Sequence, residues 1–152
     1  MRKLYTSGFI LWMIVMVAAC QPKAPDAQQI VDDTIAAHGG RQLDKAVVSF
    51  RFRDYLYRAL RDNGAYVYSR TFTDSTGQRV YDVLQNSGFT RTINDQETSL
   101  PEEGVKAFSN SVNAVIYFAL LTYFLNDDAV VKEYLGEATI KGRPYHKVKV
   151  TF

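Results

Sequence analysis

Residues 46 to 93 alternate between apolar and polar side chains, and this period of two limits the possible folds more than any other feature of the sequence. Val48, Phe50 and Phe52 alternate with serine and arginine, as a strand with one buried face requires. Turn sequences such as Asp62-Asn63-Gly64 separate the strands. The expected strands cover residues 46–53, 66–72, 80–84 and 89–93. These spacings predict an antiparallel meander.

A long apolar helix is predicted over residues 101–125. Pro101 comes early, and Ser99 and Glu102 have the spacing of a capping box. Residues 114–125 are apolar nearly all round, so another surface must cover this part of the helix. The segment is shorter than the about 20 residues that span a bilayer. Packing against the sheet is therefore favoured over contact with a membrane.

A shorter amphipathic helix precedes the strands. Asp26 and Gln29 fit a capping box, and Gly39-Gly40 ends the helix. His38 falls in the last turn, where a cation complements the helix dipole. We interpret His38 as an end-of-helix residue without a chemical role.

Strand character returns at residues 130–134 and, after a turn near Lys141-Gly142, in residues 145–152. His146 shares a face with apolar residues and is expected to be half-buried in the sheet, with no second histidine nearby for a metal site. The last strand ends at Phe152 without a closing element, so we expect a longer protein. The predicted fold class is α+β: a curved antiparallel sheet, an incomplete half-barrel, covered by helices and truncated at the C-terminus.

The N-terminus has the layout of a secretory signal peptide over residues 1–19. Arg2 and Lys3 precede an apolar stretch, and small residues lead to Cys20. Residues 17–20 resemble the bacterial lipobox, which implies that Cys20 becomes a lipid-modified mature N-terminus. The alternative is an incidental cysteine beside an ordinary cleavage site. Cys20 is the one cysteine of the chain, and secreted chains usually use cysteines in pairs, which favours lipidation.

The chain is expected to divide into the signal peptide, a lipidated tether at 20–28 and one domain at 29–152. Without residues 1–19 it carries 16 basic and 16 acidic side chains, because Arg2 and Lys3 are lost from the 18 basic residues. Nucleic acid is therefore excluded as a partner. Gln21 is not the aspartate that retains lipoproteins in the inner membrane of enteric bacteria, which favours the outer membrane, facing the periplasm.

No pattern in the sequence indicates catalysis or a cofactor. We find no nucleophile beside a base, no phosphate-binding glycine loop and no set of metal ligands. The acidic pairs 32–33, 102–103 and 127–128 are explained by helix capping and by solvation. The sequence therefore predicts a protein that is not an enzyme and needs no cofactor.

Aromatic residues are abundant, with ten tyrosines and nine phenylalanines. Their side chains can line a cavity between the sheet and the long helix, or they can fill an ordinary core. The residues predicted to line an apolar cavity are Phe50, Phe52, Tyr66, Tyr68, Phe72, Phe108, Val112, Ile116 and Phe118.

The sequence also resembles a known fold family. Residues 30–40, the strand meander and the covering helix follow the order of the lipoprotein-carrier fold, and residues 135–148 are similar to a strand-turn-strand of LolA-like and LolB-like proteins. Residues 108–118 with 125–127 resemble functionally unassigned lipoproteins of Bacteroidota. This resemblance implies an incomplete barrel around an apolar cavity that takes up acyl chains, although the chain stops before the later strands of that fold.

Three functions follow from these patterns, of which an enzyme with its catalytic groups beyond Phe152 is the least favoured. The first is a membrane-anchored protein of the cell envelope that binds a lipid or other hydrophobic ligand between the sheet and the helix. The second is an anchored structural or protein-interaction module without a ligand, whose aromatic residues only form a core.

Overall fold

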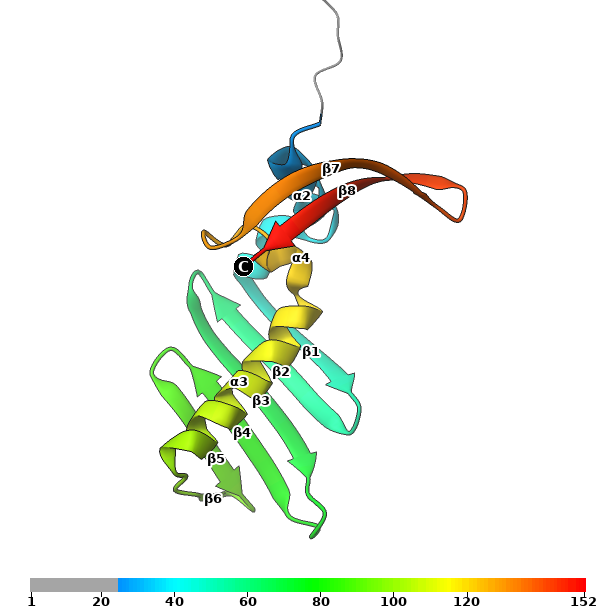
Figure 1. Ribbon diagram of the computed structural model, residues 1–152. Helices are drawn as coiled ribbons and strands as arrows, with labels where there is room; N and C mark the ends of the chain where they lie inside the picture. Colours follow the sequence, from blue (N-terminus) through cyan, green and yellow to red (C-terminus); the bar gives the residue numbers. More distant parts are fainter. Residues whose placement is uncertain (1–24) are drawn as a thin grey trace, which may run out of the picture.

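The structure, a computed structural model of the chain, describes residues 25–152. Six strands form one antiparallel sheet in which neighbours in sequence are also neighbours in space (Figure 1). The strands are β1 (Lys45–Phe52), β2 (Tyr55–Asp62), β3 (Ala65–Thr73), β4 (Arg79–Gln85), β5 (Gly88–Ile93) and β6 (Gln96–Glu97). The predicted meander and the α+β class are confirmed.

The sequence pattern did not predict β2. The turn that leads into it, at Arg53-Asp54, contains no glycine, and Arg53 itself adopts a left-handed φ of 55°. The outer face of β2 also carries exposed leucines at 56 and 60, which hides the alternation. Because leucines occupy solvent-facing positions, β2 lacks a clear alternation of apolar and polar residues and was not predicted as a strand.

Helix α2 (Ala27–Ala37) begins two residues inside the predicted tether. Asp26 caps it by accepting a hydrogen bond from the Gln28 backbone N–H at 3.1 Å. The Gln29 half of the predicted capping box is wrong, because the Gln29 side chain donates to Asp33 instead. The end-of-helix role of His38 is confirmed, with its Nδ1 atom 2.8 Å from the Thr34 carbonyl oxygen.

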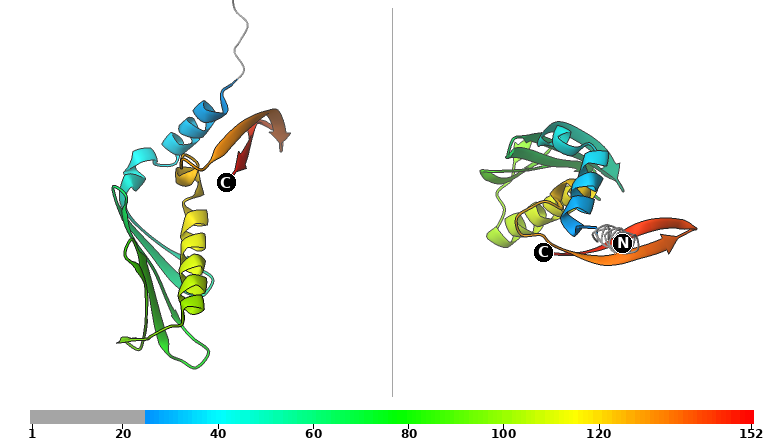
Figure 2. Two further views of the ribbon diagram at one scale, coloured as in Figure 1. Left: turned by 60° about the vertical axis from the view of Figure 1, so that its left-hand side comes forward. Right: turned by 90° about the horizontal axis from the view of Figure 1, so that it is seen from above.

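A short 3-10 helix, η1 (Gly40–Asp44), connects α2 to the sheet, and α3 (Glu102–Ala119) then crosses one face of the sheet (Figures 1 and 2). The predicted helix at 101–125 is in fact two helices, because the chain turns at Leu120 and continues as α4 (Leu121–Phe124). The predicted capping box at Ser99 is also wrong, since α3 begins at a Pro101 N-cap without a side-chain hydrogen bond.

The main core lies between the sheet and helices α3 and α4. Val112 and Ile116, one turn apart on α3, are fully buried against tyrosines of the sheet. The core residues are Tyr57, Ala59, Tyr68, Val112, Ile116, Leu120 and Phe124. The prediction that α3 must be covered all round is wrong, because the Phe118 side chain is 73% exposed. One face of the helix packs on the sheet, and the opposite face remains open.

Strands β7 (Val131–Ile140) and β8 (Arg143–Thr151) form a separate two-stranded sheet beside α2 (Figure 2). The turn at Lys141-Gly142 is confirmed, and both residues have positive φ angles, as a type I′ hairpin turn requires. His146 is exposed rather than half-buried, because this end of the hairpin extends away from the body. Among residues 25–152, the two sheets do not join into a closed barrel.

Candidate functional site

An apolar groove lies between β1 and α3, at the edge of the six-stranded sheet. Its volume is about 380 Å³. The side chains that line it are Phe50, Arg51, Phe52, Val115, Phe118 and Ala119. This groove brings together three of the predicted cavity residues, two from the strand and one from the helix.

Local periodicity places these side chains. Phe50 and Phe52 are two residues apart on β1 and therefore project from the same face of the strand. Val115, Phe118 and Ala119 have the i, i+3, i+4 spacing of one helix face, beside the buried face that carries Val112 and Ile116. The groove thus follows the boundary of the packed core.

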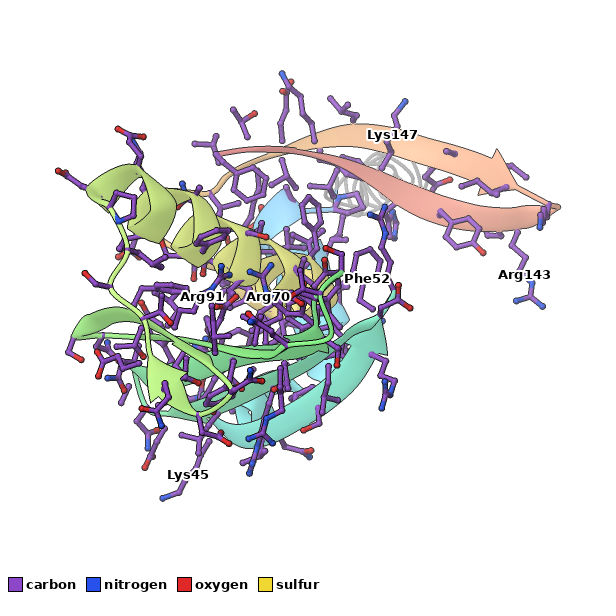
Figure 3. All side chains as sticks on the ribbon, turned by 90° about the horizontal axis from the view of Figure 1, so that it is seen from below. Lys45, Phe52, Arg70, Arg91, Arg143 and Lys147 are labelled. Carbon is purple, nitrogen blue, oxygen red and sulfur yellow. The ribbon has the colours of Figure 1, made fainter. Side chains whose placement is uncertain are left out.

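Two of the three phenylalanines that line the groove are exposed, and the third is half-buried at its base. Phe52 is 48% exposed and Phe118 is 73% exposed. Phe50 is half-buried, and its ring stacks on that of buried Tyr57, with ring centroids 5.5 Å apart. The groove therefore has a fixed aromatic base and two exposed aromatic walls, and Figure 3 shows Phe52 at this edge of the sheet.

The other predicted cavity residues lie elsewhere. Tyr68, Val112 and Ile116 are buried in the main core, and the ring of half-buried Tyr66 lies 4.6 Å from that of Tyr68, centroid to centroid. Phe72 and Phe108 are half-buried and lie beside arginine side chains. The predicted set is therefore divided among the groove, the core and a charged cluster.

That charged cluster was not anticipated from the sequence. Asp82 on β4 is fully buried and accepts hydrogen bonds from Arg70 and Arg91. The Nε–Oδ distances are 3.0 Å from Arg70 and 2.6 Å from Arg91. Arg70 also donates to Ser111 Oγ on α3 at 2.8 Å. The cluster thereby ties the sheet to the helix above it (Figure 3).

Aromatic faces complete the surroundings of the two arginines. The Arg91 guanidinium lies 3.6 Å from the centroid of the Phe108 ring. Arg70 lies 5.4 Å from the ring centroid of Phe72 and 5.5 Å from that of Tyr55. Such cation–π contacts offset part of the cost of removing a guanidinium from water. Two cations with one carboxylate leave this buried cluster with a formal charge of +1.

A second polar chain connects β2 to α4. Arg61 donates to the Tyr68 hydroxyl at 2.5 Å, and the Tyr123 hydroxyl donates to Asp44 at 2.5 Å. Burial raises the pKa of Tyr68 above its ordinary value, although Arg61 acts in the opposite direction. Burial also raises the pKa of Tyr123, and its hydrogen bond to Asp44 adds to the increase. Both phenols therefore remain protonated at neutral pH.

The acidic pairs show no convergent arrangement. Asp32 accepts from Gln28 and Asn126, and Asp33 accepts from Gln29. The pairs at 102–103 and 127–128 are exposed, the first of them in the opening turn of α3. These contacts are those of helix ends and solvated faces.

A meander sheet crossed by a helix, with an apolar groove at one edge, defines an α+β protein that is open along one side of its core. The chain belongs to DUF6503, a family of unknown function whose model matches residues 6–152. No curated protein and no solved structure matches it.

The N-terminal predictions concern residues outside the described range. The signal peptide at 1–19 and the lipidation site at Cys20 both precede residue 25. Within residues 25–152, no helix combines the length and the apolar character needed to cross a bilayer.

Proposed function

We propose that this protein is a membrane-anchored lipoprotein of the cell envelope that binds a lipid or another hydrophobic ligand in the groove between β1 and α3. The observation that carries the proposal is the exposure of Phe52 and Phe118 on opposite walls of one apolar groove. A hydrophobic ligand removes both rings from water, at about 25 cal/mol for each Å² of apolar surface buried.

The dimensions of the groove support this ligand class. Its volume of about 380 Å³ lies at the lower end of the roughly 300–1,000 Å³ typical of small-molecule sites. The groove is open to solvent, because two of its lining side chains, Phe52 and Phe118, are exposed. A linear apolar chain fits such a site better than a compact polar molecule. We interpret the sheet with its covering helix as one side of a half-barrel.

Anchoring at Cys20 fits the position of the folded part. Six residues separate Cys20 from the first residue of α2, and an extended segment of that length reaches roughly 20 Å. A lipidated Cys20 therefore keeps the domain close to its membrane, proposed to be the outer membrane on its periplasmic side. A hydrophobic ligand taken from that membrane would have a short distance to travel.

The alternative is an anchored interaction module without a ligand, and the β7–β8 hairpin favours it. The hairpin pairs with no other strand of the described chain, and it exposes several large apolar side chains. These are Val131, Leu135, Ile140, Tyr145 and Phe152. Exposed apolar patches of this kind can mark a contact with another protein. We propose no enzymatic activity, because the two members of each described acidic pair do not converge on one another.

The test uses a soluble chain that begins at Gln21, since every described element lies after residue 24. Native mass spectrometry of the purified protein should reveal co-purified lipid, and a fluorescent fatty acid should bind saturably. A clean mass spectrum together with no fatty-acid uptake would contradict ligand binding. Cross-linking in intact cells then distinguishes the alternative, which requires a stable protein partner.

A further inference from the structure

A second cleft lies where α2, η1, β2 and α4 meet, apart from the apolar groove. Its volume is about 330 Å³, and its lining is polar. The lining side chains that bear on its chemistry are Arg41, Asp44, Arg61, Tyr123 and Asp127. None of the lining residues of the apolar groove takes part in it.

The cleft contains charges of both signs that are not paired with one another. Two arginines and two aspartates line it, so its formal charge is zero. The salt bridges found among residues 25–152 involve none of these four side chains. The four charges of the cleft therefore have no ion-pair partner within the described part of the chain.

Arg61 is held in position by its neighbours but lacks a complete set of partners. Its guanidinium lies 4.7 Å from the ring centroid of Tyr123 and 5.0 Å from that of Phe124. It donates to the hydroxyls of Tyr68 and Tyr123, while its buried Nε–H has no hydrogen-bond partner among the described residues. A buried donor left unpaired is unfavourable, so the Arg61 guanidinium retains hydrogen-bonding capacity for an acceptor.

The acidic side of the cleft is also fixed. Asp44 accepts a hydrogen bond of 2.5 Å from the Tyr123 hydroxyl, and the same hydroxyl accepts one of 3.4 Å from Arg61 Nη2. These contacts form one hydrogen-bonded chain from Asp44 through Tyr123 to Arg61. It has a carboxylate at one end and a guanidinium at the other. Groups held in position in this way lose little conformational entropy when a ligand binds.

We propose that this cleft binds a small zwitterion, with its acidic group on Arg41 and Arg61 and its ammonium group on Asp44 and Asp127. A simple anion would meet two carboxylates, and a simple cation would meet two guanidiniums. A guanidinium matches the geometry of both phosphate and carboxylate. Phosphoethanolamine, a lipid headgroup, and glycine, a free amino acid, both have this chemistry.

The test is calorimetric titration of the full chain in dodecyl maltoside, a nonionic detergent. The probes are phosphoethanolamine, glycine, inorganic phosphate and ethanolamine. At least one zwitterion should bind about tenfold more tightly than either phosphate or ethanolamine, each of which carries charge of only one sign. Tighter binding of phosphoethanolamine assigns the site to a lipid headgroup, and tighter binding of glycine assigns it to a free amino acid. No saturable binding of either zwitterion up to about 10 mM would overturn the proposal.

Two variants at exposed positions distinguish a zwitterion site from a simple anion site without disturbing the core. Arg41→Gln should weaken binding of the preferred zwitterion and of phosphate. Asp127→Asn should weaken binding of the zwitterion, because it removes a carboxylate that contacts the ammonium group. The same change should strengthen binding of phosphate, because that carboxylate repels an anion. Arg58→Gln, at an exposed position on the outer face of β2, should change neither. The proposal would also be overturned if Asp127→Asn strengthened binding of the zwitterion and of phosphate equally. It would be overturned as well if neither cleft variant changed the affinity for the zwitterion.

Discussion

Arg70 and Asp82 face each other across β3 and β4, and Arg70 Nε donates to Asp82 Oδ2 at 3.0 Å in a setting where the Asp82 side chain has no exposed surface. Asp82→Asn should lower the free energy of unfolding by about 3–5 kcal/mol, because one buried and one partly buried guanidinium lose the carboxylate that they share in the described part of the chain. Urea unfolding followed by circular dichroism measures the change.

A matched control for this prediction is Asp95→Asn. Asp95 also pairs with an arginine, Arg79, but both side chains are largely exposed. Solvent screens such a pair, so the loss should be below about 1 kcal/mol. Equal effects of the two substitutions would mean that burial does not set the energy of the Asp82 cluster.

The cluster also shows what the sequence could and could not predict. A period of two puts Arg70 on the same face of β3 as Tyr68, and it puts Asp82 on the same face of β4 as Val80 and Leu84. A charged residue at an inward position needs a partner of opposite charge on a neighbouring strand. The pairing of Arg70 with Asp82 also needs the exact register across the turn at 74–77, which hydrophobic pattern alone does not fix.

Sequence periodicity also predicted part of the groove, namely which faces of β1 and α3 point inward. The period of β1 identified Phe50 and Phe52 as inward-facing, and helical spacing identified the apolar face of α3. Whether a given aromatic side chain fills the core or lines an opening depends on how the helix crosses the sheet. Ile116 and Phe118, two residues apart on α3, differ for this reason: the first is fully buried and the second is mostly exposed.

High pH should destabilise the protein through two tyrosines whose pKa values are raised by burial. The pKa values of Tyr68 and Tyr123 are raised above the ordinary value of 10.0, so the unfolded chain loses these protons at lower pH than the folded chain. The stabilisation is complete below about pH 10 and is lost as pH rises through the folded-state pKa values. Urea unfolding at several pH values up to 11 should therefore give a decreasing free energy of unfolding.

Tyr123→Phe isolates the contribution of one phenol to this pH dependence. The variant loses the hydrogen bond to Asp44 and should be less stable than the wild type at neutral pH. The difference in free energy of unfolding between the two proteins should narrow above about pH 10. There the unfolded wild-type chain ionises Tyr123 more readily than the folded chain does, which stabilises the unfolded state. A constant difference across the alkaline range would show that Tyr123 does not contribute to the loss of stability at high pH.

Cys20→Ser tests the anchor independently of any ligand. Expressed with residues 1–19 in place, wild-type protein should fractionate with membranes and incorporate labelled palmitate. Because two or more acyl chains are needed for stable anchoring, the variant should lose both properties together. Wild-type protein found in the soluble fraction would contradict lipidation, whatever the groove binds.

Phe118→Asp tests the groove with little risk to folding, since the Phe118 side chain is already 73% exposed. The carboxylate would lie on the wall of an apolar site, where a hydrophobic ligand would have to desolvate it. Fluorescent fatty-acid binding should weaken by at least about tenfold, whereas the free energy of unfolding should change by less than about 0.5 kcal/mol. Phe152→Asp is the matched control, because Phe152 is 70% exposed but does not line the groove. If both substitutions weaken binding equally, the ligand does not occupy the groove between β1 and α3, and the exposed aromatic surface of the molecule binds it nonspecifically.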